Sequence, residues 1–215
     1  MSGKIVFSTV RHDELTVEEA EDLYRLRYQT FNTRLSWKVQ CNNGLEYDKF
    51  DSEHTIYLLG KSNGKLVCSA RFIDIKYNNM IIDIFSDYFP DLTLPQGVKC
   101  YDVSRLFIDK CRRSDKGLRD KPLCKLLFIA MIEFCMNTGY EGMYAVVSKG
   151  MYHIFRRSGW NIKILKVGIS EKEETIYFIY MPATKSCIED ILNKDVNIMY
   201  EPNQFSALRL SDLTE

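Results

Sequence analysis

The chain has 215 residues, of which 46% are hydrophobic and 27% charged, so it is long enough for one domain with an ordinary core. Basic and acidic residues number 29 each, and this zero net charge argues against a general nucleic-acid-binding protein, which would be basic overall. A charged partner is therefore expected to bind at a local patch of opposite charge. We expect a single domain over residues 1–215, in which residues from about 183 form a C-terminal extension with weak structural signals.

The seven cysteines are scattered without a Cys-x-x-Cys pair, and only three histidines are present. Neither a zinc site nor a disulfide framework is expected from this pattern, and reduced thiols are typical of the cytoplasm. The N-terminus lacks the apolar core of a signal peptide, and the longest apolar stretch, residues 126–132, is too short to span a bilayer. We therefore expect a cytoplasmic protein without a bound metal or a membrane segment.

The first elements in chain order are a short strand over residues 4–10 and a helix. Thr16 and Glu19 form a capping-box pattern, which predicts a helix that starts there and runs to about Phe31. Residues 32–54 show little periodicity and are expected to form a long loop. Loops of this length in compact domains are usually functional or disordered.

Two strands, 55–61 and 65–75, are predicted to form a hairpin around Ser62-Asn63-Gly64. Residues 76–97 are irregular, and a strand over 98–109 follows. Residues 112–117 are expected to form an exposed charged loop. Pro122 and Gly139 bracket a helix with only a narrow polar stripe, which predicts a largely buried helix. The remaining expected elements are a strand at 141–148, a short helix at 151–158, and strands at 161–168 and 175–181.

Several polar and aromatic residues are unusual for this pattern. Arg27 and Phe31 are four residues apart on the predicted helix and share a face. Arg71 and Arg105 lie inside apolar strands, where a buried guanidinium needs a carboxylate partner. The chain offers three carboxylates beside its arginines, at Asp48, Asp51 and Asp102.

The set Arg27-x-x-x-Phe31, Trp37, Asp48-x-x-Asp51, Arg71 and Ser104-Arg105 resembles the N-acyl-homoserine lactone synthases, the autoinducer synthases of bacterial quorum sensing. The resemblance extends from about residue 23 to about residue 181. It implies an α+β fold with an N-acyltransferase-like mixed, splayed β-sheet and helices on both faces. The order of the predicted elements agrees with that fold.

The resemblance implies an acyltransferase that joins an acyl group from acyl carrier protein to S-adenosylmethionine. The amine attacks the thioester, and the methionine carboxylate then closes a lactone and expels methylthioadenosine. S-adenosylmethionine is a substrate, so no cofactor is expected. The implied partners are acyl-acyl carrier protein and S-adenosylmethionine, without nucleic acid or membrane.

Asp102, Ser104 and Arg105 are the candidate catalytic residues. Asp102 is the candidate base for the substrate amine, at a place where the family most often has glutamate. The shorter side chain leaves three alternatives open: a bridging water, a role in orienting the amine only, or an ion pair within the sheet. In a regular strand Ser104 shares a face with Asp102 and Arg105 takes the other, so all three can line one pocket only if a bulge or splay re-aims a side chain.

The candidate residues for S-adenosylmethionine binding are Arg27, Phe31, Trp37, Asp48 and Arg105. The arginines suit a carboxylate, and the aromatic rings suit a sulfonium or an adenine. Asp48, Asp51 and Arg71 are expected to form a structural ion-pair cluster, and salt bridges from Arg27 and Arg105 to these carboxylates are compatible with substrate binding.

Seven positions resemble the acyl-chain pocket of the family, although most would otherwise be assigned to the core: Met80, Phe128, Met131, Ala145, Val147, Met151 and Met181. A basic group at near-helical spacing suits docking of the acidic acyl carrier protein, and a solvated helix face is the alternative: Lys149, His153, Arg156 and Arg157.

Two other functions remain as alternatives. A Coenzyme A-dependent N-acetyltransferase of the same fold would need a glycine-rich pyrophosphate loop, whereas residues 112–119 contain only Gly117. A non-catalytic nucleotide-binding module would keep Trp37 and Arg27 but would need neither Asp102 nor an acyl tunnel.

Overall fold

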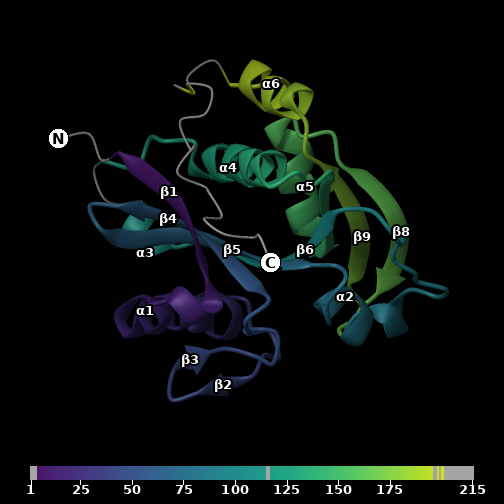
Figure 1. Ribbon diagram of the computed structural model, residues 1–215. Helices are drawn as coiled ribbons and strands as arrows, with labels where there is room; N and C mark the ends of the chain where they lie inside the picture. Colours follow the sequence, from purple (N-terminus) through teal and green to yellow (C-terminus); the bar gives the residue numbers. More distant parts are fainter. Residues whose placement is uncertain (1–3, 115–116, 196–197, 199, 201–215) are drawn as a thin grey trace.

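The computed structural model describes residues 4–114, 117–195, 198 and 200. Its centre is a seven-stranded sheet in the order β1-β4-β5-β6-β7-β9-β8 (Figure 1). The strands are β1 (Ile5–Arg11), β4 (Thr55–Ser62), β5 (Lys65–Asp74), β6 (Cys100–Ile108), β7 (Gly142–Ser148), β8 (Lys163–Ile169) and β9 (Thr175–Pro182). All neighbouring pairs are antiparallel except β6 and β7, which are parallel. This is the mixed α+β sheet that the sequence predicts.

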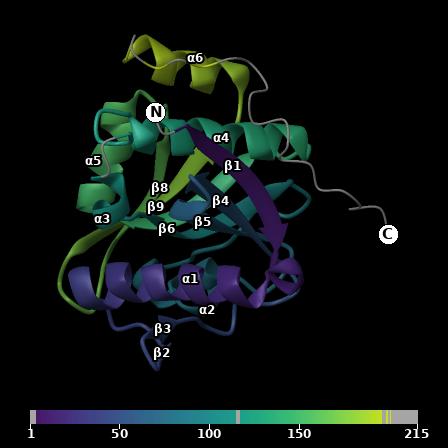
Figure 2. The ribbon, with the colours of Figure 1, turned by 90° about the vertical axis from the view of Figure 1, so that its left-hand side faces the viewer.

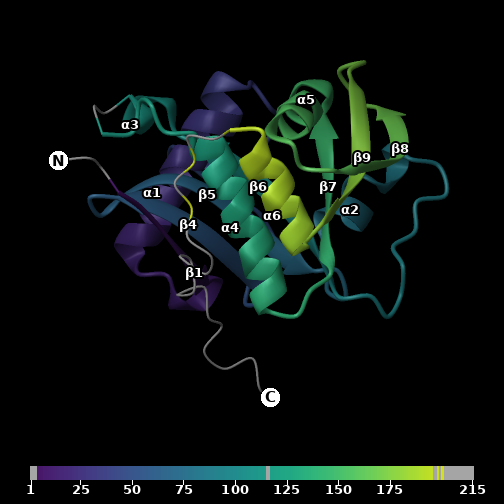
Figure 3. The same ribbon diagram turned by 90° about the horizontal axis from the view of Figure 1, so that it is seen from above.

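Helices cover both faces of the sheet, with α1 on one side and α4 and α6 on the other (Figures 2 and 3). The longer helices are α1 (Val17–Arg27), α4 (Leu123–Asn137), α5 (Lys149–Ser158) and α6 (Lys185–Asn193). The short elements are η1 (His12–Glu14), η2 (Tyr28–Arg34), β2 (Cys41–Asn42), β3 (Leu45–Glu46), α2 (Met80–Asp83), η3 (Ser86–Tyr88) and α3 (Lys110–Arg113). No helix among the described residues is long and apolar enough to cross a membrane.

The predicted capping box at the start of α1 is confirmed. The Thr16 hydroxyl accepts from the Glu19 N–H at 3.2 Å, and the Glu19 carboxylate accepts from the Thr16 N–H at 3.2 Å. The α-helix ends at Arg27 and continues as the π-helical turn η2, so the expected boundary at Phe31 is wrong. π-helical turns are often found at functional sites, and this one carries Phe31.

The main core lies between the sheet and α4, whose central residues are apolar around most of the helix. Phe128 packs on Phe155 of α5 and on Trp160, with ring centroids 4.6 and 5.6 Å apart. The buried helix predicted between Pro122 and Gly139 is therefore confirmed. The exposed loop expected after β6 is wrong for Arg112, which lies in α3 and binds Asp22 at 2.6 Å.

The chain continues after β9 into α6, a helix that the sequence analysis missed. The Thr184 hydroxyl caps it by accepting from the Cys187 N–H at 3.3 Å, and Ile188 and Ile191 are buried. Gly159, at φ 98°, lies so close to α6 that a Cβ there would stand 2.5 Å from the Asp190 carbonyl oxygen. The end of α5 therefore packs directly on α6. The rest of the expected extension, residues 196–197, 199 and 201–215, lies outside the described residues.

The sheet opens between β6 and β7. These strands pair at only three positions, the last of which is Asp102 with Tyr144. On the other side of β6, the register with β5 shifts between Ser69 and Arg71, and Arg105 opposite the shift has φ 52°. The splay and the bulge needed to bring Asp102, Ser104 and Arg105 to one site are both present.

Candidate active site

Arg27, at the C-terminal end of α1, is 1% exposed and fully engaged by two carboxylates. Its Nε donates to Glu46 at 2.5 Å, and its two terminal nitrogens donate to Asp51 at 2.7 and 3.0 Å. Because Glu46 belongs to β3, the guanidinium joins the end of α1 to the hairpin β2–β3. Arg27 is thus held in one pose by groups from two later segments of the loop.

Arg71, in the middle of β5, is also 1% exposed. Its guanidinium donates to Asp48 at 2.6 Å and to Asp51 at 3.0 Å, and its Nε donates to the Ser104 hydroxyl at 3.0 Å. The predicted ion-pair cluster of Asp48, Asp51 and Arg71 is therefore present. Its Nη2 also lies 2.9 Å from the Met80 sulfur, a weak acceptor.

Arg105 joins the same cluster because the bulge turns its side chain toward α1. Its Nε donates to Glu46 at 2.9 Å, and its Nη2 donates to Asp48 at 2.7 Å. Glu46 is 0% exposed and bridges Arg27 and Arg105, a role that the sequence analysis missed. Its place two residues before Asp48 in a polar loop gave no signal of burial.

The cluster is electrically balanced, since three guanidiniums face three carboxylates: Arg27, Arg71 and Arg105 with Glu46, Asp48 and Asp51. Burial alone would raise the pKa of Asp51, but Arg27 and Arg71 hold that pKa well below its ordinary value. Burial lowers the pKa of Arg105, against the attraction of Glu46 and Asp48. The salt bridges of Arg27 to Asp51 and of Arg105 to Asp48, which the sequence left open as an alternative compatible with substrate binding, are present.

Asp102 lies at the fork between β6 and β7 and is 2% exposed. One of its carboxylate oxygens accepts from the Met80 N–H at 2.8 Å, so among the described residues its hydrogen-bond partner is α2 rather than a basic side chain. The ion pair within the sheet that the sequence left open is wrong. Burial raises the pKa of Asp102 to about 6, despite the hydrogen bond from Met80 and the nearby charge of Arg71.

The two predicted aromatic groups lie at the outer side of the cluster. Phe31 is buried, and Trp37 stacks on it with a centroid distance of 5.2 Å while remaining 42% exposed. The Arg105 guanidinium lies 5.6 Å from the Phe31 ring centroid. An exposed indole beside a buried arginine cluster provides a flat surface for a planar ligand.

The expected acyl-pocket positions fall into two groups. Phe128, Met131, Ala145 and Met181 are buried in the main core. Val147 and Met151 pack against the same core as half-buried residues. Met80 lies apart from them, in a smaller cluster with Phe50 and Ile73, and its sulfur contacts Arg71.

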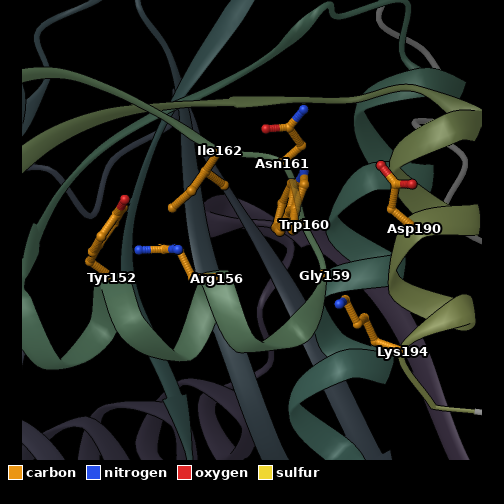
Figure 4. Close-up of a pocket in the computed structure, with 8 residues that line it drawn as sticks. All are labelled: Tyr152, Arg156, Gly159, Trp160, Asn161, Ile162, Asp190 and Lys194. Carbon is orange, nitrogen blue, oxygen red and sulfur yellow. The ribbon is translucent and has the colours of Figure 1, made fainter.

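The predicted docking residues are all exposed on α5: Lys149, His153, Arg156 and Arg157. Next to them lies a polar hollow of about 320 Å³ between α5 and α6 (Figure 4). Tyr152 and Arg156 line its α5 side, and Asp190 and Lys194 line its α6 side. This hollow is separate from the arginine cluster.

The fold defines the class of protein. The chain matches an acyl-CoA N-acyltransferase from Pseudomonas aeruginosa with a TM-score of 0.55 and 16% identity, over 84% of this chain and 100% of that one. It matches a CoA-dependent acyl-homoserine lactone synthase, BjaI, solved with SAM and isopentyl-CoA, with a TM-score of 0.77 and 19% identity, over 89% of each chain. The fold is therefore that of the N-acyltransferases, as the sequence predicts.

Sequence similarity identifies the family within that class. The sequence profile described as autoinducer synthase matches residues 11–191. An acyl-homoserine-lactone synthase from Serratia liquefaciens is 45% identical over 174 residues, which cover 80% of this chain and 86% of that one. The chain belongs to the autoinducer synthase family, and it is an acyltransferase of the acyl-homoserine-lactone synthase type.

Proposed function

We propose that this enzyme makes N-acyl-L-homoserine lactone from acyl-acyl carrier protein and S-adenosylmethionine and releases methylthioadenosine. The observation that carries the proposal is the buried cluster of three arginines and three carboxylates beside the stacked Phe31 and Trp37. The cluster offers charged partners for the methionyl part of the substrate. The exposed indole offers a face for its adenine or sulfonium.

Arg105 is the arginine best suited to the substrate carboxylate. Its side chain is 8% exposed, against 1% for Arg27 and 0% for Arg71. It is therefore the most accessible of the three guanidiniums. Arg27 and Arg71, with Asp48 and Asp51, hold the frame in which Arg105 and Trp37 bind S-adenosylmethionine.

Asp102 is the proposed base, directly or through a water. A carboxylate whose pKa is raised to about 6 by burial is still ionised at neutral pH and is a better proton acceptor than an ordinary aspartate. The Met80 N–H uses one lone pair, which leaves the carboxylate able to accept from an amine as well. Ionised Asp102 also adds one negative charge to a neutral cluster, which suits a substrate with a net positive charge.

The two bond-forming steps follow from that arrangement. The neutral amine attacks the thioester carbonyl, and the carrier thiolate leaves with the electron pair of the C–S bond. The substrate carboxylate then attacks its own γ-carbon, and the sulfonium takes the bonding pair to become methylthioadenosine. Holding these atoms together draws on the large effective molarity of intramolecular reactions.

The acyl chain is proposed to enter the core from the fork between β6 and β7. The apolar residues around α4, β7 and α5 supply its surroundings, and methionine adapts readily to a flexible chain. Exposed Lys149, His153, Arg156 and Arg157 on α5 supply the docking surface for the acidic carrier. We place the reaction in the cytoplasm, where the free cysteines would remain reduced.

The donor is tested by supplying one acyl chain on two carriers. Purified enzyme is given S-adenosylmethionine with either acyl-acyl carrier protein or the matching Coenzyme A thioester, and lactone and methylthioadenosine are quantified by mass spectrometry. We expect a higher kcat/KM with acyl carrier protein. A preference for the Coenzyme A thioester, the donor class named for BjaI, would overturn the carrier assignment but not the lactone product. Absence of lactone from both donors would overturn the proposed function.

A further inference from the structure

The arginine cluster is joined on the α1 side to a group of hydroxyl and imidazole side chains that the mechanism above does not use. The Tyr57 hydroxyl, on β4, donates to Asp51 at 2.7 Å. It lies 3.2 Å from His12 Nδ1 and 3.4 Å from the Tyr24 hydroxyl, and Tyr24 lies 3.3 Å from the same nitrogen. Three side chains from η1, α1 and β4 thus meet behind one oxygen of Asp51.

That oxygen is the most heavily used acceptor of the cluster. Asp51 Oδ1 receives hydrogen bonds from Arg27 at 2.7 Å and from Arg71 at 3.0 Å, in addition to Tyr57. A carboxylate only accepts, so the Tyr57 hydroxyl must be the donor. Tyr57 is 1% exposed, and burial raises its pKa above the ordinary tyrosine value, so it is a protonated donor at neutral pH.

The direction of the Tyr57 bond fixes the roles of its neighbours. Because its proton is committed to Asp51, the Tyr57 oxygen can only accept, from His12 Nδ1 or from Tyr24. His12 and Tyr24 thus contact the Tyr57 oxygen on the side away from Asp51 and hold the hydroxyl in its direction toward that carboxylate.

We propose that Tyr57 is a positioning residue for the arginine cluster, because its hydroxyl holds Asp51 in the pose in which that carboxylate binds Arg27 and Arg71. This proposal rests on the proposed binding of S-adenosylmethionine at the cluster. Without the Tyr57 hydroxyl, Asp51 loses one of the three donors to its Oδ1, and the frame of Arg27 and Arg71 around the substrate is held less firmly.

The test uses Tyr57→Phe, His12→Asn and the double variant in the full-length enzyme. Tyr140→Phe is the matched control, since the Tyr140 hydroxyl donates to Asp74 at 2.6 Å, away from the cluster. We measure KM and kcat for both substrates, calorimetric affinity for S-adenosylmethionine, and thermal unfolding, all at pH 7.5.

Tyr57→Phe should raise the KM for S-adenosylmethionine about tenfold at pH 7.5, the loss of a hydrogen bond to a charged group, with kcat and the donor KM little changed. His12→Asn, which removes one contact of the Tyr57 hydroxyl, should raise the same KM by a smaller factor and should have no further effect in a Tyr57→Phe background. Tyr140→Phe should lower thermal stability only.

Unchanged affinity in both single variants would overturn the proposal, as would equal effects of Tyr57→Phe and Tyr140→Phe on KM. If Tyr57→Phe does not fold, the affinity of His12→Asn for S-adenosylmethionine decides alone. Wild-type enzyme that binds no S-adenosylmethionine would refute the proposed function itself, and this proposal with it. Wild type that binds normally beside unaffected variants refutes only the role of Tyr57 and His12.

Discussion

The arginine cluster and the main apolar core, on opposite faces of the sheet, reach the same burial by opposite chemistry. On the α1 side, Arg27, Arg71 and Glu46 are at most 1% exposed and are held by ion pairs. On the α4 side, Phe128 and Phe134 are 0% exposed and are held by apolar packing. Apolar packing loses stability roughly in proportion to what is removed. A buried ionic cluster instead depends on every member, because a lone charge left behind keeps its full desolvation cost.

The largest expected effect is the loss of one carboxylate from the cluster. Glu46→Gln leaves Arg27 and Arg105 with one negative charge too few in a buried site. We expect a loss of about 3–5 kcal/mol in the free energy of unfolding. Met131→Leu, a volume-conserving change in the apolar core, should cost less than about 1.5 kcal/mol. Urea denaturation measures both, and equal losses would erase the contrast between the two faces.

Asp102 stands where the two regions meet, and its replacement should affect rate more than stability. Asp102→Asn retains an oxygen for the Met80 N–H but cannot take a proton from the amine. We expect acyl transfer to slow by about 100-fold or more, with binding of S-adenosylmethionine retained. Single-turnover measurements separate the two. A fully active Asp102→Asn enzyme would exclude Asp102 as the base.

The raised pKa of Asp102 also predicts the sign of two pH effects. The rate should increase as the pH rises through about 6, because the base must be ionised. Stability should change in the opposite direction, because the folded state keeps its proton above the ordinary pKa of 3.8. The contribution of protonated Asp102 is complete below about pH 4 and is lost as the pH rises through about 6. Asp102→Asn should lack that loss, which denaturation at pH 4 and pH 8 would reveal.

A smaller effect is expected at the exposed edge of the cluster. Trp37→Ala should weaken S-adenosylmethionine binding about tenfold, the scale of one lost stacking contact, with little change in stability because the indole is 42% exposed. Calorimetry measures the affinity. Tyr77→Ala is the control, since Tyr77 is 37% exposed and stacks on His54 instead. Equal affinities of the two variants would remove Trp37 from the substrate site.

The surface charges of α5 should matter less, and only in dilute salt. Reversal of Arg156 and Arg157 to glutamate should raise the KM for acyl carrier protein by about three- to tenfold, without changing that for S-adenosylmethionine. The difference from wild type should shrink as salt increases, because screening weakens the wild-type attraction. Lys65→Glu, an exposed reversal on β5, is the control. Identical kinetics at low salt would move the docking surface elsewhere.

The same contrast explains what the sequence could predict. Some elements depend mainly on residues close together in the sequence, so local patterns could predict them. These are the capping box at Thr16, the hairpin at Asn63 and the buried helix α4. Helix α6 was missed although the sequence holds a signal for it, the cap Thr184 followed by the buried residues Cys187, Ile188 and Ile191 at helical spacing. The expected loop 32–54 contains the end of the π-helical turn η2 and the hairpin β2–β3, which gave no periodic signal.

Within the site, arginines stood out because Arg71 and Arg105 interrupt apolar strands. The bulge at Arg105 followed from the need to place neighbouring side chains in one pocket, and it is present. Glu46, Tyr57 and His12 were missed for the converse reason. A glutamate in a polar loop or a tyrosine in an apolar strand is unremarkable until the tertiary fold brings it to a partner.

The last expected effect lies in the apolar region, at a single methyl group, and it changes the choice of acyl chain rather than the binding of either substrate. Ala145 is 4% exposed on β7 and pairs with Ile179. A threonine there would add a hydroxyl able to donate to the extra carbonyl of a 3-oxo acyl chain, which alanine cannot do. An unpaired carbonyl in apolar surroundings costs about 1–3 kcal/mol, so wild type should prefer unsubstituted chains of medium length, and Ala145→Thr should shift that preference toward 3-oxo chains. Mass spectrometry of lactones formed from equal mixtures of paired donors gives the ratio directly. A dominant 3-oxo product from wild type, or a ratio unmoved by Ala145→Thr, would show that another donor serves this carbonyl and that the methyl group does not select the substrate.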